Sequence, residues 1–160
     1  MTRVVITISM LYLLGFVQAQ NPTFTAFKGK VIKIPALQYK KGYLAEYEEY
    51  PTYTELNWEK INIPESFTEV PFPDTDLIRF FGVIFHTQMT IPLDGVYEFC
   101  LTSDDGSRIW IDGHDALNND KDHKMLKKCD TIPLRKSTYP LKLWYYQALL
   151  DRYGIIFKSK

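Results

Sequence analysis

GVYEFCLTSDDGSRIWIDG, residues 95–113, places an acidic turn between two short apolar segments. In the first segment Tyr97 and Phe99 are separated by a charged residue, so they share one face of an extended strand. The second segment ends at Asp112-Gly113, a pair that readily adopts the positive φ angles of a tight hairpin. The stretch therefore predicts a strand, an acidic turn, a second strand and a hairpin turn.

The same alternation continues on both sides of this stretch. Tyr139, Leu141, Leu143 and Tyr145 share one face of a strand, and an aromatic content of 15% with nine prolines and eight glycines favours strands over helices. We expect strands over residues 31–34, 43–47, 78–91, 96–102, 108–111, 131–134, 139–147 and 153–157, with hairpin turns at Asp94-Gly95 and Asp112-Gly113. Short strands joined by tight turns predict an all-β fold, an antiparallel β-sandwich or flattened barrel.

The N-terminal residues have the pattern of a secretory signal. Arg3 precedes the apolar run 4–17, which ends in a valine-x-alanine pattern at Ala19. The run is short for a membrane span and is not followed by a second one, so we expect a secreted, extracytoplasmic protein without membrane insertion. The predicted organisation is a signal peptide over residues 1–19, an extended lead-in over 20–41 and a packed domain over 42–160.

Charge and cysteine content narrow the classes of partner. The 19 basic and 19 acidic residues cancel, which removes the electrostatic attraction on which binding to nucleic acid or to an anionic membrane normally depends. Cys100 and Cys129 would enter an oxidising compartment, where a disulfide is chemically possible, but the sequence leaves their pairing open.

The acidic turn and its surroundings resemble the protective-antigen-14 domain family. The central match is SDDGSRIWIDG, residues 103–113, preceded by GVYEF. Further similarity covers residues 42–47, residues 109–119 with His123, and residues 139–146, so the resemblance spans roughly residues 42–158. The family includes toxin protective antigens, fungal flocculins and adhesins, and modules attached to glycosidases. The resemblance implies a β-sandwich that binds glycans or glycoconjugates.

In lectin members of that family, two adjacent aspartates flank a cis peptide and bind one calcium ion. The resemblance assigns this role to Asp104 and Asp105, as ligands of calcium and, through it, of a carbohydrate. Neighbouring side chains on a regular strand point to opposite faces, so both carboxylates reach one ion only where the backbone between them is distorted. Calcium accepts six to eight oxygen ligands in flexible geometry, whereas zinc prefers nitrogen and sulfur, which this turn lacks.

A second loop contributes to the ion in those lectins, and here it corresponds to residues 147–153. Gln147 stands where the family has an asparagine and preserves an amide oxygen, and Asp151 adds a carboxylate. A flat ring often supports the CH-rich face of a sugar, and Tyr146 and Tyr153 are the expected aromatic contacts, with Trp110 a further candidate. A packed position in the sandwich is the alternative for each ring.

The sequence shows no residue pattern that indicates a catalytic site. His114 and His123 lie among several aspartates, but a solvated turn is the favoured interpretation because no cysteine or third histidine has ligand spacing to them. His86 lies in a strand-like run, where a packed or edge position is expected. Two consecutive acids on one ion do not suit glycoside hydrolysis, which needs carboxyl groups on both sides of the scissile bond.

Two hypotheses for the function remain. The first is a secreted, calcium-dependent, lectin-like module without catalytic activity. The second is a structural or protein-interaction sandwich with a vestigial calcium site, acting alone or beside a glycoside hydrolase. The atypical composition of residues 148–152 favours the second, and the paired aspartates favour the first.

Overall fold

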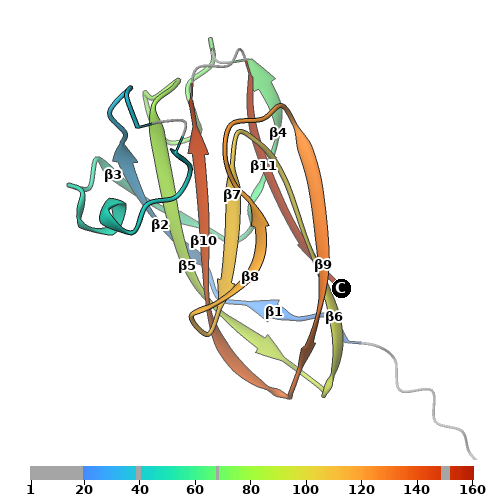
Figure 1. Ribbon diagram of the computed structural model, residues 1–160. Helices are drawn as coiled ribbons and strands as arrows, with labels where there is room; N and C mark the ends of the chain where they lie inside the picture. The colour runs from blue at the N-terminus through green and yellow to red at the C-terminus, as the bar shows by residue number, and fades with distance from the viewer. Residues whose placement is uncertain (1–19, 39–40, 68, 149–151) are drawn as a thin grey trace, which may run out of the picture.

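Two antiparallel β-sheets pack face to face in the computed structural model, which describes residues 20–160 apart from 39–40, 68 and 149–151 (Figure 1). The larger sheet has the strand order β3-β2-β5-β10-β7-β8, with β1 also paired to β5, and the smaller sheet has the order β4-β11-β6-β9. The predicted all-β antiparallel sandwich is therefore confirmed. The proposed signal peptide, residues 1–19, lies outside the described residues.

Along the sequence, the chain passes several times from one sheet to the other. Their bounds are β1 Thr23–Phe24, β2 Phe27–Lys33, β3 Thr54–Trp58, β4 Asn62–Phe67, β5 Phe81–Ile91, β6 Gly95–Asp104, β7 Ser107–Ile111, β8 His114–Asn119, β9 Leu126–Leu134, β10 Ser137–Gln147 and β11 Arg152–Ser159. Among the described residues no helix is long and apolar enough to span a membrane.

The main core lies between the sheets and follows the predicted alternation. Phe99 and Leu101 of β6 point inward toward Leu143 and Tyr145 of β10, and all four side chains are fully buried. Burial of apolar surface at about 25 cal/mol per Å² is the main force that holds such faces together.

A second apolar cluster covers part of the outer face of the larger sheet. Trp144 and Tyr146 of β10 point away from the main core, and the segment 43–50 packs over them through Tyr47. This segment forms the 3-10 helix η2, Ala45–Glu49, so the strand predicted over residues 43–47 is wrong. The apolar residues of this segment pack against the outer face of the larger sheet, and the segment does not pair with a strand.

The two predicted hairpin turns have different outcomes. Asp112 and Gly113 have φ angles of 51° and 76° and join the paired strands β7 and β8, as expected. The hairpin predicted at Asp94-Gly95 is wrong, because β5 belongs to the larger sheet and β6 to the smaller one. The segment between them is a crossing from one sheet to the other.

The predicted lead-in includes part of the sandwich. Strand β2 lies between β3 and β5, and its Val31 and Ile32 are fully buried. The strand expected over residues 31–34 is thus the second half of a longer one, and the packed domain begins before residue 42. Pro22, Gly29 and Pro35 lie in or near β2, and they make the alternation of apolar and polar residues in this strand hard to recognise in the sequence.

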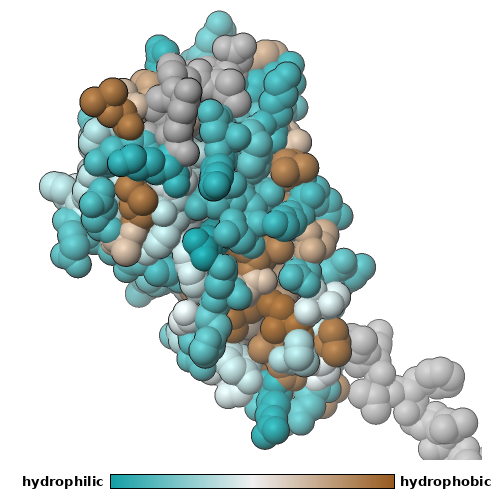
Figure 2. All heavy atoms as spheres, viewed as in Figure 1, coloured by the Kyte–Doolittle hydropathy of each residue, from teal (hydrophilic) through white to brown (hydrophobic). Residues whose placement is uncertain are grey.

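One side of the sandwich is closed by contacts between the edge strands β8 and β9. Figure 2 shows a mainly hydrophilic surface with an apolar patch in its lower half, where these two strands border a groove lined by Ala116, Ile132 and Leu134.

A disulfide connects two neighbouring strands of the smaller sheet. Cys100 of β6 and Cys129 of β9 lie directly opposite each other and are bonded. The pairing that the sequence left open is therefore formed.

Candidate functional site

Asp104 and Asp105 lie where the chain crosses from the smaller sheet to the larger one. Asp104 is the last residue of β6, and β7 begins at Ser107. The peptide bond between the two aspartates is cis, as the resemblance implied. The crossing therefore places two consecutive carboxylates at one end of the sandwich, beside the end of β10 and the beginning of β11.

The carboxylate of Asp105 accepts hydrogen bonds from two loops. Its Oδ2 accepts the main-chain N–H of Ala148 at 2.8 Å, directly after β10, and its Oδ1 accepts the N–H of His123 at 3.3 Å. The side chain has no exposed surface. Asp105 thus connects the β6–β7 crossing to the β8–β9 and β10–β11 loops.

The carboxylate of Asp104 is less well satisfied. Its residue is only 2% exposed, and its Oδ1 is buried with no hydrogen-bond partner among the described residues. Its main-chain carbonyl accepts a hydrogen bond of 2.8 Å from the hydroxyl of Tyr145. A buried acceptor without a donor is costly, and it marks a position where a cation or a ligand donor would be stabilising.

Both carboxyl groups have a pKa above the ordinary aspartate value. Burial, followed by the charge of Glu65, raises the pKa of Asp104 from 3.8 to about 6. Burial, followed by a hydrogen bond with Asp122, raises the pKa of Asp105 well above its ordinary range. Desolvated carboxylates with raised pKa values at one position are typical of a functional site.

A buried network of hydrogen bonds holds the β6–β7 crossing against the β8–β9 loop. The hydroxyls of Ser103 and Ser107 lie 2.7 Å apart, and the amide of Asn119 donates to Ser103 Oγ and to the carbonyl of Leu126, both at 3.1 Å. The ring nitrogens of His123 lie 2.8 Å from the carbonyl of Asn119 and 2.9 Å from that of Lys124. The sequence pattern indicates a solvated turn for this segment and misses the burial of Asn119.

Close backbone contact explains the glycine after the two aspartates. A Cβ atom at Gly106 would lie 2.3 Å from Cε1 of Tyr146 and 2.7 Å from the main-chain nitrogen of Lys121. The carbonyl of Gly106 also accepts the N–H of Tyr146 at 3.0 Å. Glycine therefore lets the crossing pack directly against β10 and the β8–β9 loop.

The same loop is tied to the segment at residues 42–43. Asp120 Oδ2 accepts the main-chain N–H of Tyr43 at 2.7 Å, and a Cβ at Gly42 would lie 2.7 Å from the same oxygen. Gly42 has a φ of 71°, a conformation that glycine adopts without a steric penalty. Two segments far apart in the sequence thus meet next to the aspartate pair.

Gln147 lies at the site, but its amide already has protein partners. Its Oε1 is 3.1 Å from the hydroxyl of Tyr145, and its Nε2 donates to the carbonyl of Arg152 at 2.8 Å. The hydroxyl of Tyr145 lies between Gln147 and the carbonyl of Asp104, so the residue is connected to the pair through one group. Asp151, the other ligand expected in this loop, lies outside the described residues.

The expected aromatic contacts for a sugar are not available as ring faces. Tyr146 is 1% exposed and lies in the outer apolar cluster, and Tyr153 is 2% exposed, packs on Phe72 and donates its hydroxyl to the carbonyl of Pro71. Neither ring therefore presents an exposed face, because both faces of these strands are covered. Trp110 is half-buried on the outer face of the larger sheet, between Tyr43 and the cation of Lys142.

The family model of the PA14 domain, the protective-antigen-14 domain, matches residues 39–153. The chain belongs to the PA14 domain family. The match includes the aspartate pair, the β8–β9 loop and all of β10. A comparison of the sequence with curated proteins finds no match.

Solved structures with PA14 domains share the fold at low sequence identity. The PA14 sugar-binding domain of an RTX adhesin has a TM-score of 0.62 at 11% identity, over 85% of this chain and 89% of that one. The epithelial adhesin 9 A domain of Candida glabrata, solved in complex with Galβ1-3GlcNAc, has a TM-score of 0.56 at 11% identity, over 85% and 81% of the two chains. At such identities the likeness shows the fold alone.

The same fold also occurs within a much larger enzyme. A GH31 α-xylosidase from Xanthomonas citri has a TM-score of 0.60 at 8% identity over 88% of this chain. The chain spans only 15% of the length of that enzyme, so the similarity concerns one module of it.

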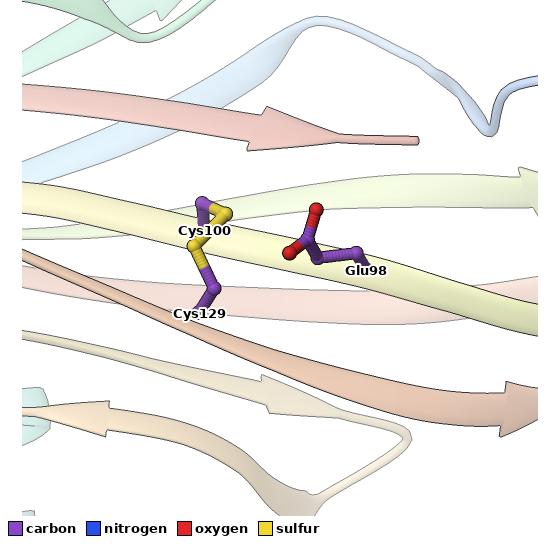
Figure 3. Close-up of side chains that lie close together, drawn as sticks. All are labelled: Glu98, Cys100 and Cys129. Atoms are coloured by element: carbon purple, nitrogen blue, oxygen red, sulfur yellow. A yellow bond between two sulfur atoms is a disulfide. The ribbon is translucent and has the colours of Figure 1, made fainter.

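The donor atoms at the PA14 aspartate pair suit a hard cation. Two carboxylates, one of them with an unpartnered buried oxygen, are the oxygen ligands that calcium prefers. In the described part of the chain, one group of three acidic or sulfur-bearing residues lies close enough together to share an ion, namely Glu98, Cys100 and Cys129 (Figure 3). Its two sulfur atoms are bonded to each other, so this group is a disulfide beside a carboxylate and not a metal site.

Proposed function

We propose that this PA14 domain is a calcium-dependent carbohydrate-binding module without catalytic activity. The observation that carries the proposal is the buried pair Asp104-Asp105, in which one carboxylate oxygen of Asp104 lacks a hydrogen-bond partner among the described residues. Calcium, when bound, would offer its remaining coordination positions to hydroxyl oxygens of a sugar.

The residues around the pair have separate roles in this proposal. Asp104 and Asp105 would hold the ion, and the N–H groups of Ala148 and His123 orient the carboxylate of Asp105 toward it. The hydroxyl of Tyr145 stays protonated, since burial raises its pKa well above the ordinary value, and it fixes the main chain at Asp104. The site is therefore organised before any ion arrives, which lowers the ordering cost of binding.

Two adhesin domains of the same fold support the ligand class. The RTX adhesin domain is described as sugar-binding, and the Candida glabrata domain holds a disaccharide. We extend this ligand class, glycans or glycoconjugates, to the present chain. Which sugar it prefers depends on the shapes of the loops around the aspartate pair.

Export is part of the same proposal. The Cys100–Cys129 disulfide supports it, because such bonds persist in oxidising compartments and are rare in the cytosol. The apolar N-terminal run of the sequence gives independent support. A cell-fractionation experiment that finds the chain in the cytosol, with its N-terminal residues intact, would exclude export.

A glycan array read with calcium and again with a chelator tests the binding function. The wild-type domain should bind a subset of neutral glycans only when calcium is present, and Asp105→Asn should lose that signal. Asp112→Asn is the matched control, because this aspartate is exposed, lies at a positive φ that asparagine accepts, and is in the β7–β8 turn. Absence of any neutral-glycan signal with calcium, or neutral-glycan binding that survives Asp105→Asn, contradicts the proposal.

One observation favours the second candidate, a protein-interaction sandwich with a vestigial site. The amide of Gln147 contacts Tyr145 and Arg152, and neither Tyr146 nor Tyr153 offers an exposed ring. This candidate requires that calcium leave the melting temperature unchanged while a partner protein is recovered from the outer surface of the producing cell. A calcium-dependent rise in melting temperature excludes it.

A further inference from the structure

A groove of about 610 Å³ crosses the outer face of the larger sheet, on strands β2, β5, β7 and β10 and away from the aspartate pair. The strand register places one row of outward side chains across it. Lys28 of β2 pairs with His86 of β5, His86 with Lys142 of β10, and Lys142 with Trp110 of β7. Four strands thus contribute one residue each to a continuous wall.

The concave shape follows from residue size in the row beside this wall. Gln88 of β5 pairs with Pro140 of β10, and Ala26 and Gly113 line the same region. Pro140, Ala26 and Gly113 have shorter side chains than Lys28, Lys142 and Trp110, so the surface steps down between the two rows. The ring of Tyr43 closes the groove beside Trp110.

The charge of the groove is opposite to that of the aspartate site. Its lining holds two lysines and a histidine and contains neither aspartate nor glutamate. Lys142 contacts Glu48 at 2.5 Å, whereas the ammonium of Lys28 forms no ion pair with any described residue. Lys28, with the amide of Gln88 nearby, therefore provides free hydrogen-bond donors for an anionic group.

The apolar part of the lining indicates the rest of the ligand. The groove is several times larger than one carboxylate needs, and its lining also contains the ring of Pro140 beside Gln88 and, toward β7, the rings of Trp110 and Tyr43. Sites that combine apolar walls with a few convergent polar groups bind organic ligands and not bare inorganic ions.

We propose that this groove binds a carboxylate-bearing sugar residue, a uronic acid, independently of calcium. The carboxylate would contact the ammonium of Lys28 and the ring of His86, and the C–H face of the sugar would lie against Pro140 and the edge of Trp110. The site goes beyond the proposed calcium-dependent function, because it lies on the sheet face and uses the ammonium of Lys28 in place of a metal ion.

Isothermal titration calorimetry with digalacturonic acid in the presence of a chelator tests the groove alone. Saturable binding is expected for the acid, with neither its neutral counterpart galactobiose nor sodium phosphate giving comparable heat. Lys28→Gln should weaken binding at least about tenfold, the effect of losing one charge-assisted hydrogen bond. Lys158→Gln is the control, since it removes the same charge from an exposed position of β11.

Each outcome of this titration decides the proposal. Absence of saturable binding overturns it, as does equal weakening by Lys28→Gln and Lys158→Gln, which would indicate a general charge effect. Phosphate that binds as tightly as the acid reduces the groove to a simple anion site and also overturns it. If Lys28→Gln shows a lowered melting temperature, Gln88→Leu tests the same donors without a charge change. All measurements exclude calcium, so failure here leaves the calcium-dependent function intact.

Discussion

Replacing Asp104 with asparagine should change the stability of the domain in opposite directions with and without calcium. The pKa of Asp104 is about 6 in the folded protein, compared with an ordinary value of 3.8. A difference of about two pKa units corresponds to up to about 3 kcal/mol, since one unit is worth about 1.4 kcal/mol. The ionised carboxylate thus destabilises the metal-free fold above pH 6.

The sign of the pH dependence follows from this raised pKa. The stability that protonation of Asp104 contributes is fully present below pH 3.8 and is lost as the pH rises to about 6. The amide introduced by Asp104→Asn does not titrate, so this variant should match the metal-free wild type near pH 4 and exceed it at pH 7.5. Some solvent contact, and the burial of an unpaired amide, reduce the expected gain to about 1–2 kcal/mol.

Calcium should reverse this order. At a calcium concentration about one hundred times the dissociation constant, the wild type should gain about 2.7 kcal/mol, and the variant should gain almost nothing. Urea unfolding at pH 4 and pH 7.5, each with calcium and with chelator, measures all of these contributions, and Asp112→Asn serves as the control. The reasoning is refuted if calcium stabilises Asp104→Asn as much as the wild type, or if the variant is less stable than the wild type in chelator at pH 7.5.

Three further predictions concern the packing around the site. Gly106→Ala should lower the free energy of unfolding by about 2–3 kcal/mol, because its Cβ would overlap main-chain atoms. Gly95→Ala, whose Cβ would meet no atom closer than 3.5 Å, should change it by less than about 1 kcal/mol. Urea titrations measure both values, and equal effects would contradict the packing argument. Joint replacement of Cys100 and Cys129 by alanine should lower the free energy of unfolding by about 3–4 kcal/mol, as expected for a disulfide between residues 29 positions apart. An unchanged melting temperature in calorimetry would contradict a formed disulfide. Tyr146→Phe should leave the melting temperature unchanged or raise it, because the buried hydroxyl has no partner among the described residues, and a fall equivalent to more than about 1 kcal/mol would reveal a hidden hydrogen bond.

The sandwich and the acidic turn at Asp104-Asp105 could be predicted because both depend on local patterns, whereas the role of the two aspartates is implied by the family resemblance. The alternation of Phe99 with its neighbours fixes which face of β6 is buried, and β6 then delivers Asp104 to the end of the sheet. The Asp112-Gly113 hairpin could be predicted for the same reason, since its positive φ angles are a property of the two residues themselves.

The remaining features depend on contacts between distant segments. Tyr146 has the alternation of an outward residue and is nevertheless buried, because the segment around Tyr47 covers it. Asp94-Gly95 has the composition of a hairpin turn, and only the pairing of β5 and β6 in different sheets shows that it is a crossing. Asn119 is a similar case, since its buried amide bonds to Ser103, sixteen positions earlier in the chain.

A crystal structure of the domain grown in excess calcium, with anomalous diffraction data, tests the central claim most directly. The account predicts an anomalous peak at the β6–β7 crossing, with carboxylate oxygens of Asp104 and Asp105 about 2.4 Å from the ion. Absence of a peak there, with Oδ1 of Asp104 still unpartnered and the carboxylate of Asp105 still bonded to Ala148 and His123, would contradict it.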